Sequence, residues 1–313
     1  MRPYSRVYAT VNLDAVASNM RSMRDNLPAS TLIMGSVKAD GYGHGSVPVA
    51  KTIEPYVFGY AVATIDEGII LRRHGINKTI LILGVTHESQ YEELLRYDIR
   101  TSMFQYEKAK KLSDLALKQG KKAVVHLALD TGMSRIGMKA DREHAKEAAA
   151  IAALEGIEVE GLFTHFARAD ETDKSAYEEQ YRRYKEFLGY LKELGVKIPI
   201  RHCSNSAGIV ESLESNHMDM VRAGIAIYGM YPSDEVDHNS VKLTPAMEIK
   251  SCITYIKEIE AGTAVSYGGT FVADHTMKVA TIPVGYGDGY VRSLSGKGDV
   301  LIHGKRAAIL GRI

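Results

Sequence analysis

Residues 32–45 read Leu32-Ile33-Met34-Gly35-Ser36-Val37-Lys38-Ala39-Asp40-Gly41-Tyr42-Gly43-His44-Gly45. A short apolar run ends in a lysine, and a glycine-rich turn follows at once. Such a run is typical of a buried strand, and glycine lets the backbone approach a ligand closely because it has no Cβ. A lysine amine becomes nucleophilic where an apolar or cationic setting lowers its pKa. The stretch predicts a strand that presents Lys38 to a ligand; a solvated strand-end lysine is the alternative.

Short apolar runs of this kind alternate along the chain with segments of helical period. The runs are 32–37, 56–63, 79–85, 99–103, 123–130, 159–164, 200–204 and 220–226. Helices are expected at 14–27, 64–74, 105–119, 141–154 and 175–194. Strands that alternate with helices indicate parallel β-α-β units, and eight units in about 230 residues is the size of a (β/α)8 TIM barrel. The competing fold, a doubly wound sheet, usually has about five or six strands.

The composition changes after the eighth run. Residues 231–240 are polar and rich in turn formers, which predicts a linker. Beyond them lie β-like segments without any helical pattern, at 246–259, 271–272, 278–283, 300–302 and 307–310. We therefore predict a barrel over residues 1–238 and an all-β domain over residues 239–313. Residues 309–313 look like the middle of a strand, so we expect this β domain to be incomplete.

Charge and composition exclude several classes of partner. The chain has 39 basic and 38 acidic side chains, so nothing indicates a nucleic acid or an anionic membrane as partner. Its first 30 residues contain no apolar signal-peptide core, and no apolar stretch approaches the roughly 20 residues of a membrane helix. Two cysteines, Cys203 and Cys252, are too few for a disulfide framework. A cytoplasmic globular protein is expected.

Polar residues follow the predicted strands at the end where (β/α)8 enzymes carry their active sites. Lys38 and Tyr42 follow the first strand, Arg135 the fifth and His165 the sixth, and the eighth runs into Arg222. A lysine, two arginines and a histidine are thereby expected around one barrel mouth.

The loops after the seventh and eighth strands are the usual phosphate site of this fold. Ser204, Asn205, Ser206 and the amides near Gly224 are suitable neutral donors. A phosphate site beside a reactive lysine predicts a phosphorylated carbonyl cofactor held as an imine, which is pyridoxal 5'-phosphate. No His or Cys lies at zinc-like spacing to His165, so we expect no metal.

From about residue 5 to its end the sequence resembles the alanine racemases, which are fold-type III pyridoxal-phosphate enzymes. The motifs that carry the resemblance are 37–45, 130–137, 221–229, 266–270 and 284–290. The resemblance implies an isomerase that interconverts L- and D-alanine and so supplies D-alanine for peptidoglycan. It also implies a homodimer with shared active sites.

The resemblance assigns roles to individual residues. Lys38 would hold the cofactor and act as one catalytic base, and Tyr267 of the second subunit would be the opposing base. Arg222 would bond the pyridine nitrogen, and Arg135 the cofactor phenolate or the substrate carboxylate. Tyr42, Ser206, Gly224 and Ile225 would hold the phosphate with Asn205 beside them, and His165 would link Arg222 to Tyr267. The substrate entryway would be lined by Asp170, Tyr286, Arg292 and Arg312.

Two bases suit the reaction, because a proton leaves one face of Cα and another returns to the opposite face. A tyrosine is a poor base at its usual pKa near 10, so it needs cationic neighbours, for which we expect His165 and the arginines. An arginine at the pyridine nitrogen stays protonated and does not give the ring a full proton. This limits the ring as an electron sink and disfavours transamination.

The sequence departs from the family at two places. The family often has a modified lysine seven residues before the loop arginine, where this chain has Ala128. Arg135 is therefore expected to be held by another group, such as an anion. The chain also ends before a Cys-Met-Asp segment and a later phosphate-binding tyrosine of the family.

Three other functions compete with alanine racemisation. They are a serine or broad-spectrum amino-acid racemase, a non-catalytic pyridoxal-phosphate carrier, and a shortened chain that binds cofactor without turnover. The carrier shares the barrel but lacks a second domain, so the segment 266–268 and the β domain argue against it.

Overall fold

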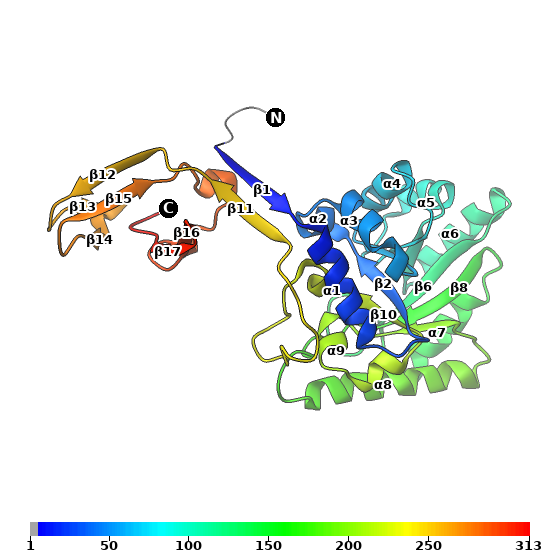
Figure 1. The fold of residues 1–313 in the computed structure, drawn as a ribbon. Helices are drawn as coiled ribbons and strands as arrows, with labels where there is room; N and C mark the ends of the chain where they lie inside the picture. Colours follow the sequence, from blue (N-terminus) through cyan, green and yellow to red (C-terminus); the bar gives the residue numbers. More distant parts are fainter. Residues whose placement is uncertain (1–5) are drawn as a thin grey trace. The chain divides into compact units, whose positions relative to one another are not determined.

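The computed structural model describes residues 6–313, which form two compact units, residues 12–246 and residues 6–11 with 247–313. The larger unit is a closed barrel of parallel strands, in which the last strand pairs with the first (Figure 1). The barrel strands are β2 (Leu32–Ser36), β3 (Gly59–Val62), β4 (Thr79–Ile82), β5 (Arg100–Met103), β6 (Ala123–Asp130), β8 (Ile157–Phe163), β9 (Ile200–His202) and β10 (Met220–Ala223). The predicted eight-stranded barrel is confirmed.

Helices surround the barrel, and each has buried residues. They are α1 (Leu13–Asp25), α3 (Ser46–Ile53), α4 (Ile65–Arg73), α5 (Tyr91–Tyr97), α6 (Tyr106–Lys118), α7 (Arg142–Ala152), α8 (Ser175–Glu193) and α9 (Ser206–Val210). In α8 the buried side chains recur every three or four residues, as an amphipathic helix requires. Side chains of Asn12, Thr64 and Asp141 cap α1, α4 and α7 by accepting a backbone N–H of the first turn.

Shorter elements complete the barrel unit. They are α2 (Lys38–Tyr42), β7 (Met138–Lys139) and the 3-10 turns η1 (Glu54–Tyr56), η2 (Glu88–Gln90), η3 (Glu214–His217) and η4 (Ile225–Tyr228). The strand β7 pairs with the end of β6.

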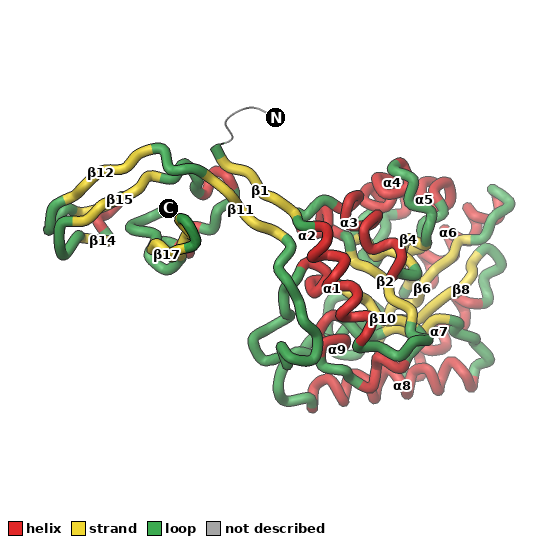
Figure 2. The backbone as a smooth tube through the Cα atoms, viewed as in Figure 1, coloured by secondary structure: helices red, strands yellow, loops and turns green. Residues whose placement is uncertain are grey.

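The smaller unit consists of antiparallel strand pairs and turns. The pairs are β1 (Val7–Val11) with β11 (Met247–Ser251), β12 (Tyr255–Ile259) with β15 (Met277–Thr281), β13 (Ala264–Val265) with β14 (Phe271–Val272), and β16 (Asp299–Ile302) with β17 (Lys305–Ala308). The 3-10 turns η5 (Tyr267–Gly269), η6 (Tyr286–Asp288) and η7 (Arg292–Leu294) lie in the loops between them. Figure 2 draws the strands of this unit in yellow and its loops in green. The predicted all-β character of this region is confirmed.

The two units divide the chain at places other than the boundary expected from sequence. The sequence places the boundary at residue 238, whereas the barrel unit extends to Ala246. The reason is packing: Val236 and Val241 are buried, and the Asn19 side chain bonds both the N–H and the carbonyl of Thr244. Strand β1 was not predicted, and it belongs to the smaller unit through its pairing with β11. Residues 1–5 of the predicted barrel lie outside the described residues.

Over residues 6–313, every helix is too short or too polar to cross a membrane.

Candidate active site

A cavity of about 230 Å³ lies in the barrel unit and is lined by four of the polar side chains that the sequence placed at strand ends. Its lining combines charged and polar groups with apolar walls: Lys38, Arg135, His165 and Arg222, together with Ala63, Leu83, Gly84, Leu129, Met133, Ile136 and Phe163. The cavity is therefore a mostly apolar pocket with one amine, two guanidinium groups and one imidazole, a composition typical of small-molecule sites.

Lys38 begins a left-handed turn. Residues 39–42 all have positive φ, between 50° and 61°, and the N–H groups of Gly41 and Gly43 bond the carbonyls of Val37 and Ala39. Left-handed helical backbone costs an L-residue roughly 1–2 kcal/mol, and of these four residues only Gly41 avoids that cost. The glycine-rich turn expected from sequence is thus a strained turn held mostly by non-glycine residues.

Two carboxylates hold this turn in place. One oxygen of Glu67 accepts the Ala39 N–H at 2.8 Å, and the other accepts the Ala63 N–H at 2.7 Å. The carboxylate of Asp40 accepts the N–H of Ser46 at the start of α3. Glu67 therefore joins the chain that follows β2 to the chain that follows β3, next to the lysine.

The predicted phosphate-binding residues converge on one point. The Ser206 hydroxyl accepts the Gly224 N–H at 2.9 Å. A Cβ added to Gly224 would lie 3.5 Å from Ser206 Oγ and 3.6 Å from Tyr42 Oη. Gly224 therefore leaves open a small space bounded by two hydroxyl groups. Ile225, the next residue, opens η4 and is half-buried.

Asn205 has a structural role beside this space. Its carbonyl oxygen accepts the Gly208 N–H and caps α9, and its amide nitrogen donates to the Phe166 carbonyl. Both ends of the side chain are thus engaged within the protein, and it fixes the position of the adjacent Ser206.

Arg222 lies on β10, where it is buried and lines the cavity. Its Nη1 donates to His202 Nδ1 at 2.8 Å, and its Nη2 donates to the Thr164 carbonyl at 2.7 Å and to His165 Nδ1 at 3.2 Å. Burial lowers the pKa of Arg222 to about 10, so the guanidinium remains charged near neutral pH.

His165 is neutral in this setting. Burial, followed by the charges of Arg222, Arg135 and Lys38, lowers the pKa of His165 to about 3. A guanidinium can only donate, so His165 Nδ1 is the acceptor toward Arg222 and its proton resides on Nε2. A neutral His165 offers a hydrogen-bond donor at Nε2 in place of the positive charge expected from sequence.

Arg135 lies in the loop after β6. Asp130 shapes this loop by accepting the N–H groups of Gly132 and Ser134. Among residues 6–313, no hydrogen-bond or ion-pair partner contacts the Arg135 guanidinium, which is exposed, and Ala128 is buried in the strand. The sequence predicts that another group holds Arg135, because position 128 is not a lysine. No side chain of residues 6–313 has that role.

The remaining predicted residues lie outside the cavity lining. In the smaller unit, Tyr267 is 80% exposed at the start of η5, and the Ser266 hydroxyl donates to the Arg312 carbonyl. Tyr286 and Arg292 begin η6 and η7. In the barrel unit, the Asp170 carbonyl accepts from the Ser233 hydroxyl.

Comparison with known proteins places the chain in one family. The model of the alanine racemase N-terminal domain matches residues 11–232, and that of the alanine racemase C-terminal domain matches residues 246–313. The chain belongs to the alanine racemase family.

Individual relatives agree with this assignment. The alanine racemases of Desulforamulus reducens and Clostridium perfringens are 44% and 43% identical to the chain over 98% of its length, which covers 83% and 79% of theirs. Among solved structures, alanine racemase of Clostridium difficile 630 superposes with a TM-score of 0.92 at 40% identity, over 99% of this chain and 81% of that one. The Bacillus anthracis alanine racemase with bound L-Ala-P gives 0.89 at 34% identity, over 100% and 81%.

Alanine racemases are pyridoxal-phosphate-dependent isomerases, and the residues of this chain fit that cofactor. The cavity offers an amine for its carbonyl group, and Gly224 leaves a space between two hydroxyls that suits a phosphate. Ser206 accepts an amide N–H there, so its own proton can be donated to an anion. The match to the family's C-terminal domain also argues against a carrier that lacks a second domain.

Sequence reasoning missed Glu67, whose signal was available. Thr64 and Glu67 stand three residues apart at the start of α4, which is the capping-box pattern. The pattern predicts that Glu67 turns back toward the helix start, but not that it also reaches Ala39.

Proposed function

We propose that this chain interconverts L- and D-alanine with Lys38 and Tyr267 as two opposing bases. The observation that carries the proposal is the cavity that Lys38, Arg135, His165 and Arg222 line together. The Tyr42 ring, whose hydroxyl bounds the space at Gly224, lies 5.9 Å from Lys38 Nζ. Bound pyridoxal phosphate supplies an acceptor for the electron pair left at Cα. The residues of the chain bind and orient it and move the protons.

Lys38 would hold the cofactor through its amine, and its free amine would move a proton at one face of Cα. Tyr42, Ser206, Gly224 and Ile225 hold the phosphate, and Asn205 fixes Ser206. Arg222 faces the pyridine nitrogen with a proton that it keeps. Arg135 binds the substrate carboxylate or the cofactor phenolate, since it is the cavity guanidinium without a protein partner among the described residues.

Tyr267 of a second subunit serves the opposite face. Its exposed position suits a side chain that completes the site of another copy of the chain. His165 stabilises the phenolate by donating its Nε2–H rather than by positive charge, because its Nδ1 already accepts from Arg222. Asp170, Tyr286, Arg292 and Arg312 line the entryway. The enzyme is thus a homodimer with shared sites, which acts in the cytoplasm and supplies D-alanine for peptidoglycan.

A direct test is the loss of optical activity, followed by circular dichroism, with L-alanine, D-alanine and L-serine as separate substrates. We expect both alanine enantiomers to reach the same racemic end point, with L-serine much slower. The matched Lys38→Ala variant should have neither the activity nor the absorbance of covalently attached cofactor. If cofactor-loaded protein left the circular dichroism signal of alanine unchanged, the proposal would be overturned. If L-serine lost its signal faster than L-alanine, serine and not alanine would be the preferred substrate.

A further inference from the structure

Arg222 is a buried cation whose contacts in the described chain are all neutral. It donates to the carbonyls of Thr164, His202 and Cys203 and to the imidazoles of His165 and His202, and it lies over the Phe163 ring. A buried charge normally has a charged partner, because its desolvation is costly. The nearest counter-charge must therefore act through one of these neutral groups.

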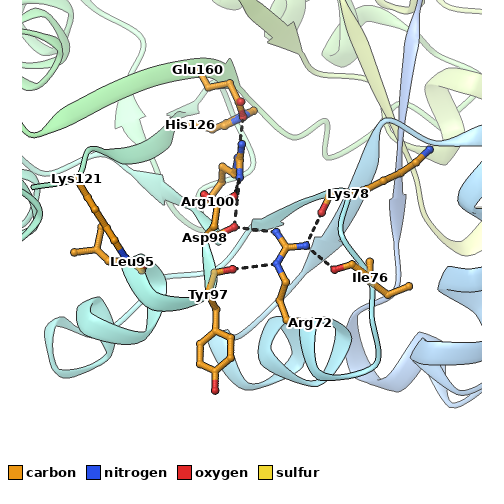
Figure 3. Close-up of polar contacts among 10 residues, drawn as sticks. All are labelled: Arg72, Ile76, Lys78, Leu95, Tyr97, Asp98, Arg100, Lys121, His126 and Glu160. Atoms are coloured by element: carbon orange, nitrogen blue, oxygen red, sulfur yellow. Dashed lines mark hydrogen bonds and ion pairs between the residues drawn. The ribbon is translucent and has the colours of Figure 1, made fainter. Parts of the chain in front are cut away.

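A continuous chain of hydrogen bonds leads from Arg222 to a carboxylate. His202 Nδ1 lies 2.8 Å from Arg222 Nη1, and His202 Nε2 lies 2.8 Å from His126 Nδ1. His126 Nε2 lies 2.9 Å from Glu160 Oε2. The Glu160 carboxylate in turn faces Arg100 at 3.5 Å, which also pairs with Asp98 (Figure 3).

The proton positions in this series of hydrogen bonds follow from its two ends, Arg222 and Glu160. The guanidinium has no acceptor, so His202 Nδ1 must accept. Burial lowers the pKa of both His202 and His126, so each is neutral and has one N–H. His202 therefore donates from Nε2 to His126 Nδ1, and His126 donates from Nε2 to Glu160. Every donor has an acceptor, and the reverse arrangement would set two donors against each other at Arg222.

Two backbone features accommodate this series of hydrogen bonds: a β-bulge at Glu160 and a glycine at position 161. Val125 pairs with Val159 and His126 pairs with Gly161, so Glu160 is the extra residue of a β-bulge. A bulge re-aims a side chain that a regular strand would direct elsewhere. A Cβ on Gly161 would lie 2.5 Å from His126 Nδ1 and 2.8 Å from the Ile200 carbonyl. Glycine is thus required where the His126 ring lies against β8.

The Arg100 end of this series of hydrogen bonds is also fixed. Asp98 has a left-handed backbone with φ of 49°. Its carbonyl accepts from Arg72, which also donates to the carbonyls of Tyr97, Ile76 and Lys78 (Figure 3). Arg100 is therefore held against Glu160 by a turn that Arg72 secures.

We propose that Glu160 is a positioning residue for the reaction: through His126 and His202 it provides the counter-charge of Arg222 and fixes the direction in which that guanidinium points. This rests on the proposed function, in which Arg222 faces the pyridine nitrogen. Glu160 touches neither substrate nor cofactor in this account. It sets the histidine tautomers, and the tautomer of His202 decides whether its Nδ1 can accept the hydrogen bond from Arg222 Nη1.

The test combines histidine 15N NMR with kinetics on the cofactor-loaded protein. In the wild type both His126 and His202 should carry their proton on Nε2. Glu160→Gln should disturb the tautomer of His126 and lower kcat by about tenfold, with KM changed by less than about threefold, because a neutral amide is a weaker acceptor than a carboxylate. The control is Glu158→Gln, an exposed site two residues earlier on β8, which should change neither readout.

A conservative variant and the wild-type tautomers complete the test. Glu160→Asp keeps the charge and should recover part of the lost kcat, which protects the test if Glu160→Gln folds poorly. A proton on Nδ1 of His202 or His126 in the wild type would overturn the proposal, as would Glu160→Gln with unchanged tautomers and kcat. The NMR result does not depend on turnover, so a wild type that fails to racemise alanine would count against the proposed function alone.

Discussion

The carboxylate of Glu67 accepts a hydrogen bond of 2.8 Å from the backbone N–H of Ala39, the residue after Lys38. Its other oxygen accepts from Ala63 at 2.7 Å. One side chain thereby satisfies amide groups at the ends of two neighbouring strands. Because the turn after Lys38 is left-handed and costly for L-residues, this carboxylate contributes to keeping the lysine directed into the cavity.

Replacing Glu67 by Gln should loosen the turn, because an amide side chain has one acceptor oxygen for two N–H donors. We expect kcat to fall by about tenfold. We also expect the absorbance of the cofactor attached to Lys38 to depend on pH differently from that of the wild type. Thr64→Val is the matched control. It removes the α4 cap and costs about 1 kcal/mol of stability, but it leaves the bond to Ala39. Equal loss of activity in the two variants would mean that the helix start matters and the bond to Ala39 does not.

Gly224→Ala should weaken cofactor binding without unfolding the protein. The new methyl would meet Ser206 Oγ and Tyr42 Oη at ordinary contact distances. It would, however, fill the space assigned to the phosphate. Absorbance titration of the apoprotein with pyridoxal phosphate should show at least about tenfold weaker affinity, at an apoprotein melting temperature close to that of the wild type.

Gly229→Ala is the contrasting variant, since its Cβ would lie 1.9 Å from the Thr244 carbonyl and its φ is +83°. We expect it to lower the melting temperature. Unaltered cofactor affinity in Gly224→Ala would show that the phosphate lies elsewhere.

Acid should destabilise the protein partly through His165. The pKa of His165 is about 3 in the folded chain, lowered by burial and then by Arg222, against an ordinary value of 6.5. Between these values the unfolded chain binds more protons, so the free energy of unfolding falls as pH decreases. Each such histidine contributes a slope of up to about 1.4 kcal/mol per pH unit.

Urea denaturation of the wild type and His165→Gln between pH 6 and pH 4 measures this contribution. Glutamine does not titrate, so the variant should lose stability less steeply as the pH falls. Parallel curves would mean that His165 becomes protonated in the folded protein. A cationic His165 would then interact with Tyr267 by charge, contrary to the neutral donor described above.

The barrel could be predicted from sequence because its strands and helices have distinct hydrophobic periods. The same fold places strand ends together, so Lys38, Arg135, His165 and Arg222 could be assigned to one mouth from the order of the strands alone. Strand β1 was missed because its partner lies at residues 247–251 and no local pattern reveals that pairing.

Other features needed coordinates. The left-handed turn was missed because Ala39, Asp40 and Tyr42 have no intrinsic preference for that backbone. Glu160 was missed because a bulge, visible only in the pairing of β6 with β8, decides where it points. Tyr267 and the entryway residues came from family resemblance, since nothing in their local sequence places them at the site.

The central claim is that Lys38 and Tyr267 serve opposite faces of the substrate. Exchange of the α-proton with solvent deuterium, followed by NMR from L-alanine and from D-alanine separately, tests it most directly. Lys38→Ala should abolish exchange together with the cofactor absorbance. Tyr267→Phe should slow exchange from one enantiomer by about a hundredfold or more and affect the other far less. Equal and undiminished exchange from both enantiomers in Tyr267→Phe would contradict the two-base account.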